Sequence, residues 1–331
     1  ILAAVCLPRQ RRLEITESLD ELGRLADSAG AVVVGRVIQE RLAPSPGLHF
    51  GKGKVLEIQA LARERGADVL ILDDDLTPVQ ERNLHKALDL KVVDRTALIL
   101  DIFAQRARTS EGKLQVELAQ LSYVLPRLVG QWKHLERLGG GIGTRGPGET
   151  QLESDRRVVR RRIRRIQKEL QGIQNHRRLL RGHRRAAGFP VVAMVGYTNA
   201  GKTTLLNHLS GSAFAAADRL FVTLDPAARL VARQNRRPFI LTDTVGFIRK
   251  LPHQLVAAFK ATLEELVDAG LFLHVVDGSQ REVAAHISAV ERLLNELDLS
   301  GRPSILVFNK LDRVEEPNGL RVLLAASGGV G

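Results

Sequence analysis

The sequence predicts an α/β protein with three successive parts, and three patterns in the chain lead to this prediction. Apolar runs of strand length alternate with helical patterns over residues 1–108, which is typical of a small parallel sheet. Two apolar seams at heptad spacing follow in residues 109–188 and predict an antiparallel helical hairpin of the coiled-coil type. In residues 189–331, apolar runs lead into short glycine-rich or polar motifs, which predicts a second parallel α/β domain.

In the first part, runs rich in Val, Ile and Leu predict strands, and longer runs between them predict helices. The predicted strands are Ala31–Val37, Asp68–Asp73 and Lys91–Asp94, and the predicted helices are Val55–Gly66 and Pro78–Asp89. The first residues of the chain also resemble a strand. Gly51–Lys54 reads GKGK without the spacing of a phosphate loop, so it is either a phosphate contact or, as we prefer, the turn that starts a helix.

The second part contains two apolar seams in which spacings of four and three residues alternate, as in a coiled coil. The first comprises Leu114, Leu118, Leu121, Leu125 and Leu128, and the second comprises Val159, Ile163, Ile166, Leu170 and Ile173. Two seams this close in sequence can cover each other, so we expect an antiparallel hairpin whose arginines point outward. Pro126 is expected to kink the first helix.

Most of the positive charge of the chain lies in this hairpin. The formal net charge is +12, and residues 150–188 alone contain 13 Lys and Arg against three Asp and Glu, with no aromatic residue. This focused charge favours a phosphate-rich partner, and the lack of aromatic side chains favours a structured RNA backbone over stacked single-stranded bases. The alternative is a solvated helix face.

A glycine-rich segment, Gly139–Thr150, separates the two seams, with six glycines in its first ten residues and Arg145 at its tip. Glycines let a chain approach another backbone closely, so we expect a loop that becomes ordered against RNA. The alternative is a simple connector.

The third part begins with an apolar run, Pro190–Val195, that leads into GYTNAGKT at Gly196–Thr203. This is the spacing of a P-loop, and a predicted helix follows it over Thr204–Gly211. The glycines permit a tight turn that presents backbone N–H groups to phosphate oxygens. Lys202 is expected to reach the β- and γ-phosphates, and the Thr203 hydroxyl is expected to bind Mg²⁺.

Two further apolar runs end in motifs that complete a guanine-nucleotide site. In DTVG at Asp243–Gly246, the carboxylate is expected to serve Mg²⁺ and the Gly246 N–H to contact the γ-phosphate. In NKLD at Asn309–Asp312, the carboxylate can accept from both N–H donors of the guanine edge, whereas adenine would leave that charge unpaired. The three motifs together predict a protein that binds GTP rather than ATP and hydrolyses it.

Weaker candidates complete the predicted site. Thr223 lies in a loop region before the DTVG strand, where a threonine can add a ligand to Mg²⁺ when the γ-phosphate is present. Ala325, Ala326 and Ser327 can supply a backbone N–H to the guanine oxygen, or they are simply the end of a strand.

The residue after Gly246 departs from the small GTPases, which have a glutamine there to orient the attacking water. Phe247 cannot do this, so hydrolysis by the isolated chain should be slow or use other means. Asn199 resembles the P-loop asparagine of potassium-activated GTPases, in which a monovalent cation supplies transition-state charge. Its alternative role is to stabilise the loop.

The predicted residues fall into three sets. The catalytic set is Lys202, Asn199, Thr223 and Gly246, and the metal ligands are Thr203, Thr223 and Asp243. The nucleotide contacts are Gly196, Tyr197, Thr198, Asn199, Ala200, Gly201, Lys202, Thr203, Thr204, Asp243, Gly246, Asn309, Lys310, Asp312, Ala325, Ala326 and Ser327. The expected cofactors are GTP or GDP, Mg²⁺ and, at Asn199, K⁺.

Length and composition narrow the protein class. A chain of 331 residues is long enough for two or three domains. One cysteine, Cys6, excludes a disulfide framework and favours the reducing cytoplasm. No apolar run approaches the roughly 20 residues that span a bilayer. For the oligomeric state, we expect a monomer. The chain starts without Met and ends in GGVG, before the helix that normally closes such a domain, so we expect truncation at both ends.

With these motifs in hand, the chain resembles the HflX family of translational GTPases over nearly all of its length. The segments that resemble this family are Val92–Leu128, Gly140–Arg157, GYTNAGKTTLLN, TLDPAAR and LTDTVGFI, and the last of these includes the hydrophobic Phe247. The resemblance implies binding to the ribosome, chiefly to its large subunit, with the hairpin and glycine loop near the peptidyl transferase centre. It also implies splitting of stalled or idle ribosomes, with GTP hydrolysis used for release. The chain departs from the family in lacking the closing helix and a small C-terminal domain, and in having Ala325 where serine is usual.

Two other functions stay open at this stage. A ribosome-assembly or RNA-modification GTPase would have the same nucleotide site and another RNA target. An RNA-binding module would hold GTP only as a structural ligand. Stimulation of hydrolysis by large ribosomal subunits separates these alternatives.

Overall fold

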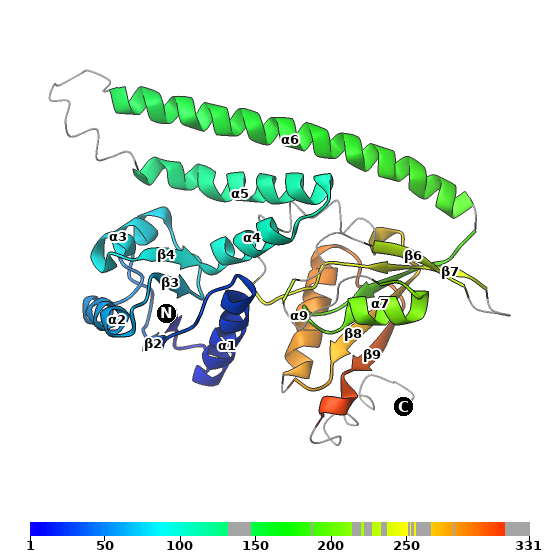
Figure 1. Cartoon of the computed structure of the whole chain (residues 1–331), viewed down its shortest axis with the longest axis horizontal. Coiled ribbons are helices and arrows are strands. Elements are labelled where there is room, and N and C mark those ends of the chain that lie inside the picture. The colour runs from blue at the N-terminus through cyan, green and yellow to red at the C-terminus, as the bar shows by residue number, and fades with distance from the viewer. Residues whose placement is uncertain are drawn as a thin grey trace. The chain divides into compact units, whose positions relative to one another are not determined.

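The computed structural model of the chain is shown in Figure 1. It describes residues 1–131, 147–186, 188–213, 220–221, 227–232, 237–250, 252, 255, 266–280 and 282–314. The chain divides into two compact units. The first contains Ile1–Gln105 and Val116–Lys168, and the second contains Arg106–Gln115 and Glu169–Gly331. The predicted class, α/β with a helical middle region and a P-loop domain, is confirmed.

The first unit contains a four-stranded parallel sheet in the order β2-β1-β3-β4 (Figure 1). Its strands are β1 (Leu2–Cys6), β2 (Arg36–Glu40), β3 (Val69–Leu72) and β4 (Lys91–Asp94), and its helices are α1 (Arg12–Ser28), α2 (Lys52–Arg65), α3 (Pro78–Leu88) and α4 (Arg95–Arg106). Strands β1 and β3 are short apolar runs that are largely buried, as expected for a parallel sheet. The sequence patterns described above do not predict α1 and α4.

The strand predicted at Ala31–Val37 is wrong in position, because β2 begins only at Arg36. The register explains the shift, since the five residues of β1 pair with Arg36–Glu40 and leave no partner strand for the preceding valines. Val32 is accordingly 85% exposed. High strand propensity did not produce a strand here, because a strand needs a neighbour to satisfy its backbone groups.

Two long helices form the helical middle region, α5 (Ser110–Gln131) and α6 (Pro147–Ala186). Within the first unit they run antiparallel and side by side (Figure 1), joined by an ion pair between Arg162 and Glu117 in which Nε–Oε1 is 2.6 Å and Nη2–Oε2 is 2.7 Å. This pairing holds the pKa of Glu117 below its ordinary value. Helix α5 continues through Pro126 to its end.

The predicted seams are only partly confirmed. Ile166 and Leu170 are buried, but the five predicted leucines of α5 are half-buried, and its buried apolar residues are Val116, Ala119 and Tyr123. Helix α5 has a second neighbour besides α6, namely the chain at the ends of β3 and β4. Arg127 lies 3.4 Å over the ring of Tyr123 on the same helix, and it donates to the Leu76 carbonyl at 2.9 Å and to the Asp94 carboxylate at 3.0 Å. This face of α5 therefore contacts the chain where β3 and β4 end.

The second unit contains a five-stranded sheet in the order β6-β7-β5-β8-β9, in which only β6 is antiparallel to its neighbour. Its elements are β5 (Val191–Val195), α7 (Lys202–Ser210), β6 (Ala227–Val231), β7 (Phe239–Asp243), β8 (Leu271–Asp277), α9 (Val283–Glu296), β9 (Ser304–Asn309) and a 3-10 helix, η2 (Leu311–Arg313).

Alternate residues of β5 enter two apolar cores in this unit. Val192 and Met194 pack in a cluster with Leu206 of α7, and Ala193 and Val195 pack in another with Val290 of α9. Both faces of the sheet are therefore covered, and the P-loop, DTVG and NKLD motifs lie where strands end. None of the helices that the structure describes is long and apolar enough to cross a membrane.

Candidate nucleotide-binding site

The P-loop is the turn between β5 and α7, as its sequence predicts. Gly201 has a φ of 93°, and a Cβ there would collide with the Asn309 amide, so both the backbone conformation and the space require glycine. Asn199 has a φ of 61°, which asparagine tolerates better than most residues. The two alternative roles of Asn199, K⁺ binding and stabilisation of the loop, both stay predictions.

Lys202 is the first residue of α7, and its buried side chain extends back over the P-loop. Its ammonium Nζ donates to the carbonyl oxygens of Gly196 at 3.0 Å and Tyr197 at 2.9 Å. Burial lowers the pKa of Lys202 to about 8, and the charge of Asp243 opposes this shift. The loop thus holds a desolvated positive charge at the N-terminus of a helix, and this arrangement attracts phosphate.

The predicted metal ligands from two elements meet in the structure. The Thr203 hydroxyl, on the first turn of α7, donates to the Asp243 carboxylate at the end of β7 over 2.7 Å. Asp243 is completely buried. A hydroxyl and a carboxylate are hard oxygen donors of the kind that Mg²⁺ prefers, so the pair fits this ion.

The segment after β7 lies directly against the P-loop. The backbone N–H of Thr198 donates to the Phe247 carbonyl at 2.6 Å, and the Phe247 N–H donates to the Gly196 carbonyl at 3.1 Å. Gly246 is so close that a Cβ would lie 2.6 Å from the Thr198 Cα and 3.2 Å from the Lys202 ammonium. Glycine is therefore required at this position, and its backbone is beside the lysine that is expected to meet the phosphates.

Phe247 itself is 3% exposed and packs in the apolar core with Ala193, Val195 and Leu266. Its side chain therefore has a packing role in the interior of the unit. Phe247, which stands where small GTPases have a glutamine, is thus part of the apolar core. Its side chain has no group that could form a hydrogen bond with the attacking water.

The NKLD motif is attached to the P-loop by its first residue. The Asn309 amide donates to the Ala200 carbonyl at 2.9 Å, across 109 residues of sequence. Lys310 adopts a φ of 57°, and its ammonium lies 2.9 Å from the carboxylate of Asp277, at the end of β8. Asp312 follows in η2 and is exposed to solvent.

Asp277 is a functional candidate that the sequence prediction missed. It accepts from the Ser279 hydroxyl at 2.6 Å and backbone N–H at 3.0 Å, besides pairing with Lys310. Burial would raise the pKa of Asp277, but these hydrogen bonds and the lysine outweigh burial and lower it. The available signal was an aspartate at the end of another apolar run, HVVD.

Several predicted residues fall outside the described part of the chain. These are Thr223, the segment Ala325–Ser327, and Gly139–Gly146 with Arg145. Their roles stay predictions.

Comparisons with known proteins identify the family. Three family models match successive stretches, described as GTP-binding GTPase N-terminal over residues 16–104, GTP-binding GTPase Middle Region over 106–184 and 50S ribosome-binding GTPase over 191–310. A GTPase HflX from Caldanaerobacter subterraneus is 53% identical over 302 residues, which cover 91% of this chain and 71% of that protein. A GTPase HflX from Escherichia coli is 51% identical over 300 residues, which cover 91% and 70%.

The chain belongs to the HflX family of GTPases. It binds guanine nucleotides and hydrolyses GTP at the P-loop domain of this family. Among solved structures, a complex of SsGBP with GDP is similar, with 27% identity and a TM-score of 0.51, over 98% of this chain and 87% of that chain.

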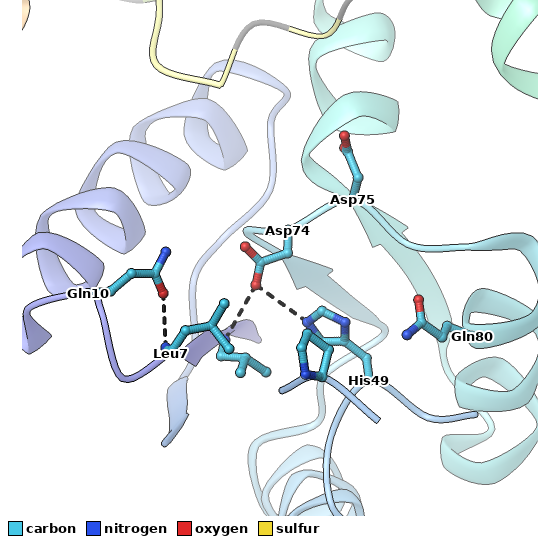
Figure 2. Close-up of a pocket in the computed structure, with 8 residues that line it drawn as sticks. Leu7, Gln10, His49, Asp74, Asp75 and Gln80 are labelled. Atoms are coloured by element: carbon cyan, nitrogen blue, oxygen red, sulfur yellow. Dashed lines mark hydrogen bonds and ion pairs between the residues drawn. The ribbon is translucent and has the colours of Figure 1, made fainter. Parts of the chain in front are cut away.

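The first unit of this HflX-family chain has a cavity of its own, shown in Figure 2. It has a volume of about 210 Å³ and lies beyond the ends of β1 and β3, lined by Val5, Leu7, Gln10, Pro44, His49, Asp74, Asp75 and Gln80. His49 lies 3.4 Å from the Asp74 carboxylate. The lining includes two aspartates and neither lysine nor arginine, so its charge does not favour a phosphate group.

The GKGK segment beside it is the start of a helix, as we preferred. Gly51 is the N-terminal cap of α2, and the Lys54 ammonium pairs with Glu57 at 2.7 Å within the same helix.

Proposed function

We propose that this GTPase binds the ribosome, chiefly its large subunit, and splits stalled or idle ribosomes, with GTP hydrolysis as the switch that releases it. The observation that carries the proposal is the charged surface of α6. Arg157, Arg160, Arg161, Arg164, Arg165 and Lys168 are all exposed and recur at spacings of one, three and four residues. They form one continuous basic face, which suits the phosphate backbone of folded RNA. The family membership and the description of the matched GTPase model support the choice of the ribosome.

For the nucleotide site, we propose that Thr203 and Asp243 hold Mg²⁺, together with Thr223, and that Asn199 serves K⁺. Bound Mg²⁺ would neutralise charge on the β- and γ-phosphates. The chain's own residues bind and orient the substrate. Lys202 and the loop N–H groups hold the phosphates, Gly246 offers its backbone to the γ-phosphate, and Asn309, Lys310 and Asp312 select guanine.

The glycine-rich loop at Gly139–Thr150 is proposed to become ordered against ribosomal RNA, as an extension of the basic helix. We propose a monomer that acts in the cytoplasm. The single cysteine, Cys6, is buried and supports a reducing compartment.

The deciding experiment measures GTP hydrolysis with and without large ribosomal subunits, at matched KCl and NaCl concentrations. We expect strong stimulation by the subunits, and a higher rate in KCl if Asn199 serves K⁺. Sucrose-gradient analysis of intact ribosomes with a non-hydrolysable GTP analogue should show separated subunits. Stimulation without separation would favour a ribosome-assembly or RNA-modification GTPase, and absence of both would favour an RNA-binding module with GTP as a structural ligand.

A charge-reversal variant tests the basic face directly. Replacing Arg160, Arg161 and Arg164 with glutamate should weaken subunit binding and lower the log–log salt slope by about 1 for each phosphate that the helix no longer neutralises. Basal GTP hydrolysis should persist, because these side chains are outside the nucleotide site. Sedimentation with large subunits across a KCl series measures the slope.

A matched control reverses three exposed cations on α2, Lys52, Arg63 and Arg65. It changes the net charge equally and should leave the slope unchanged. Equal effects of the two triple variants would mean that net charge, and not the α6 face, drives binding. Deletion of Gly140–Gly148 should also impair subunit binding and spare nucleotide affinity.

A further inference from the structure

The side chain of Tyr197 has contacts that phosphate binding does not need. A P-loop contacts phosphates through backbone N–H groups and its lysine, and its pattern accepts any residue directly after the first glycine. Tyr197 is nevertheless 6% exposed. Its hydroxyl oxygen accepts a hydrogen bond from the backbone N–H of Arg249 at 2.7 Å, and its ring stacks on His286 of α9, with centroids 3.9 Å apart and planes 12° apart.

The segment that Tyr197 contacts is the continuation of DTVG. Phe247 forms the two backbone hydrogen bonds to the P-loop, and the guanidinium of Arg249 pairs with Glu282, directly before α9, at 2.5 Å. Residues 246–249 are thus held at one end by the P-loop backbone, in the middle by the core packing of Phe247, and at the other end by the Tyr197 hydroxyl and Glu282. Among the contacts described above, the side chain of Tyr197 is the one that connects the P-loop with both residues 246–249 and α9.

We propose that Tyr197 is a positioning residue for GTP hydrolysis. Its hydroxyl and its stack on His286 fix residues 246–249 against the P-loop, and so keep the Gly246 backbone beside the Lys202 ammonium. In the nucleotide site proposed above, this position matters for the γ-phosphate, the group that water attacks and that is transferred from GTP to water with GDP as the leaving group. It does not matter for the α- and β-phosphates that GDP retains. Tyr197 therefore supports the rate of the chemical step more than the affinity for GDP.

The first test is Tyr197→Phe, which keeps the ring and its stack but removes the acceptor for the Arg249 N–H. A net hydrogen bond of ordinary strength corresponds to a rate change of about two- to tenfold. We expect the single-turnover rate of GTP hydrolysis at saturating GTP to fall by this factor, while GDP affinity changes by less than about twofold. Tyr197→Leu, which also removes the stack, should lower the rate further.

The chain offers a matched control, because it has only two tyrosines. Tyr123 belongs to the first unit and is also buried, so Tyr123→Phe makes the same chemical change in the unit that does not contain the P-loop. It should leave GTP hydrolysis unchanged.

A second variant weakens the anchoring of residues 246–249 without a substitution in the P-loop. Glu282→Gln removes the charge that pairs with Arg249 and should also slow hydrolysis with GDP affinity preserved. It keeps the test decisive if Tyr197→Phe fails to fold. Normal hydrolysis by the folded Tyr197→Phe variant would overturn the proposal, as would normal hydrolysis by Glu282→Gln where only that variant folds. A parallel loss of GDP affinity and rate would also overturn it, because it would show general damage to the P-loop.

Discussion

The sheet of the first unit and the sheet of the second unit both have aspartates where their strands end, and the two sets of aspartates have different neighbours. In the first unit, Asp73 is paired with the buried Arg95 at 2.7 Å and accepts from Ser18 at 2.7 Å. Asp94 is paired with Arg127 at 3.0 Å. In the second unit, Asp243 accepts from Thr203 and lies near the charge of Lys202.

The turns after the central strands differ between the two units, and only the turn after β5 has the sequence pattern of a P-loop. The turn after β1 reads LPRQ and contains neither glycine nor lysine, whereas the turn after β5 contains Gly196, Gly201 and then Lys202. Backbone N–H groups can converge on a phosphate only where the chain can turn this tightly. The aspartates at the strand ends of the first unit are thus held in ion pairs, whereas Asp243 of the second unit lies beside the P-loop, where it is proposed to hold Mg²⁺.

Loss of the buried cation of the first unit should have a large effect on stability. Arg95→Ala leaves Asp73 and Glu21 buried without their shared cation, and breaking such a pair costs about 3–5 kcal/mol. Chemical denaturation should show the loss in the first unit, while GTP hydrolysis per folded molecule stays normal. Arg12→Ala, which removes an exposed pair with Glu40, is the control and should have little effect. A stable Arg95→Ala protein would mean that these carboxylates do not depend on their partner.

Lys202→Ala tests the proposed phosphate site of the second unit. It removes a desolvated charge from the phosphate site and should lower GTP turnover by about 100- to 1,000-fold, as expected for a preorganised group in a buried site. Nucleotide affinity and single-turnover hydrolysis measure the loss. Lys54→Ala, in the GKGK turn of the first unit, is the matched control and should hydrolyse GTP normally. If both variants lost activity, the contrast between the two units would fail.

The second unit is expected to lose stability in acid because of a buried histidine. Burial and the nearby Lys202 charge lower the pKa of His274, in β8, from 6.5 to about 4. The folded state therefore binds a proton less readily than the unfolded state, so stability is complete above pH 6.5 and is lost as the pH falls from 6.5 toward 4. The loss should be on the order of 3 kcal/mol.

Thermal unfolding of the second unit at several pH values should show this loss, and His274→Gln should reduce it. The exposed His208 of α7 provides the control, since His208→Gln should leave the acid sensitivity unchanged. An equally acid-sensitive His274→Gln protein would place the titrating group elsewhere.

The sequence by itself determined where the nucleotide chemistry lies. GYTNAGKT, DTVG and NKLD are each an unbroken stretch of sequence, and each follows an apolar run that forms a strand. Their order and the strand ends could therefore be predicted from short-range patterns. The parallel sheets and both long helices followed from the same periodicities. The family resemblance was confirmed, and the roles of Thr223 and Ala325–Ser327 stay predictions.

Tertiary structure alone decided which residues from separate segments meet. Tyr197 reaches Arg249 and His286, Lys310 pairs with Asp277, and Asn309 holds Ala200, over separations that no local pattern records. It also decided that β2 starts at Arg36 and which face of α5 is buried. The physical reason is that periodicity reports only which side of an element is apolar, whereas a backbone hydrogen bond, an ion pair or a ring stack depends on the neighbour that packing supplies.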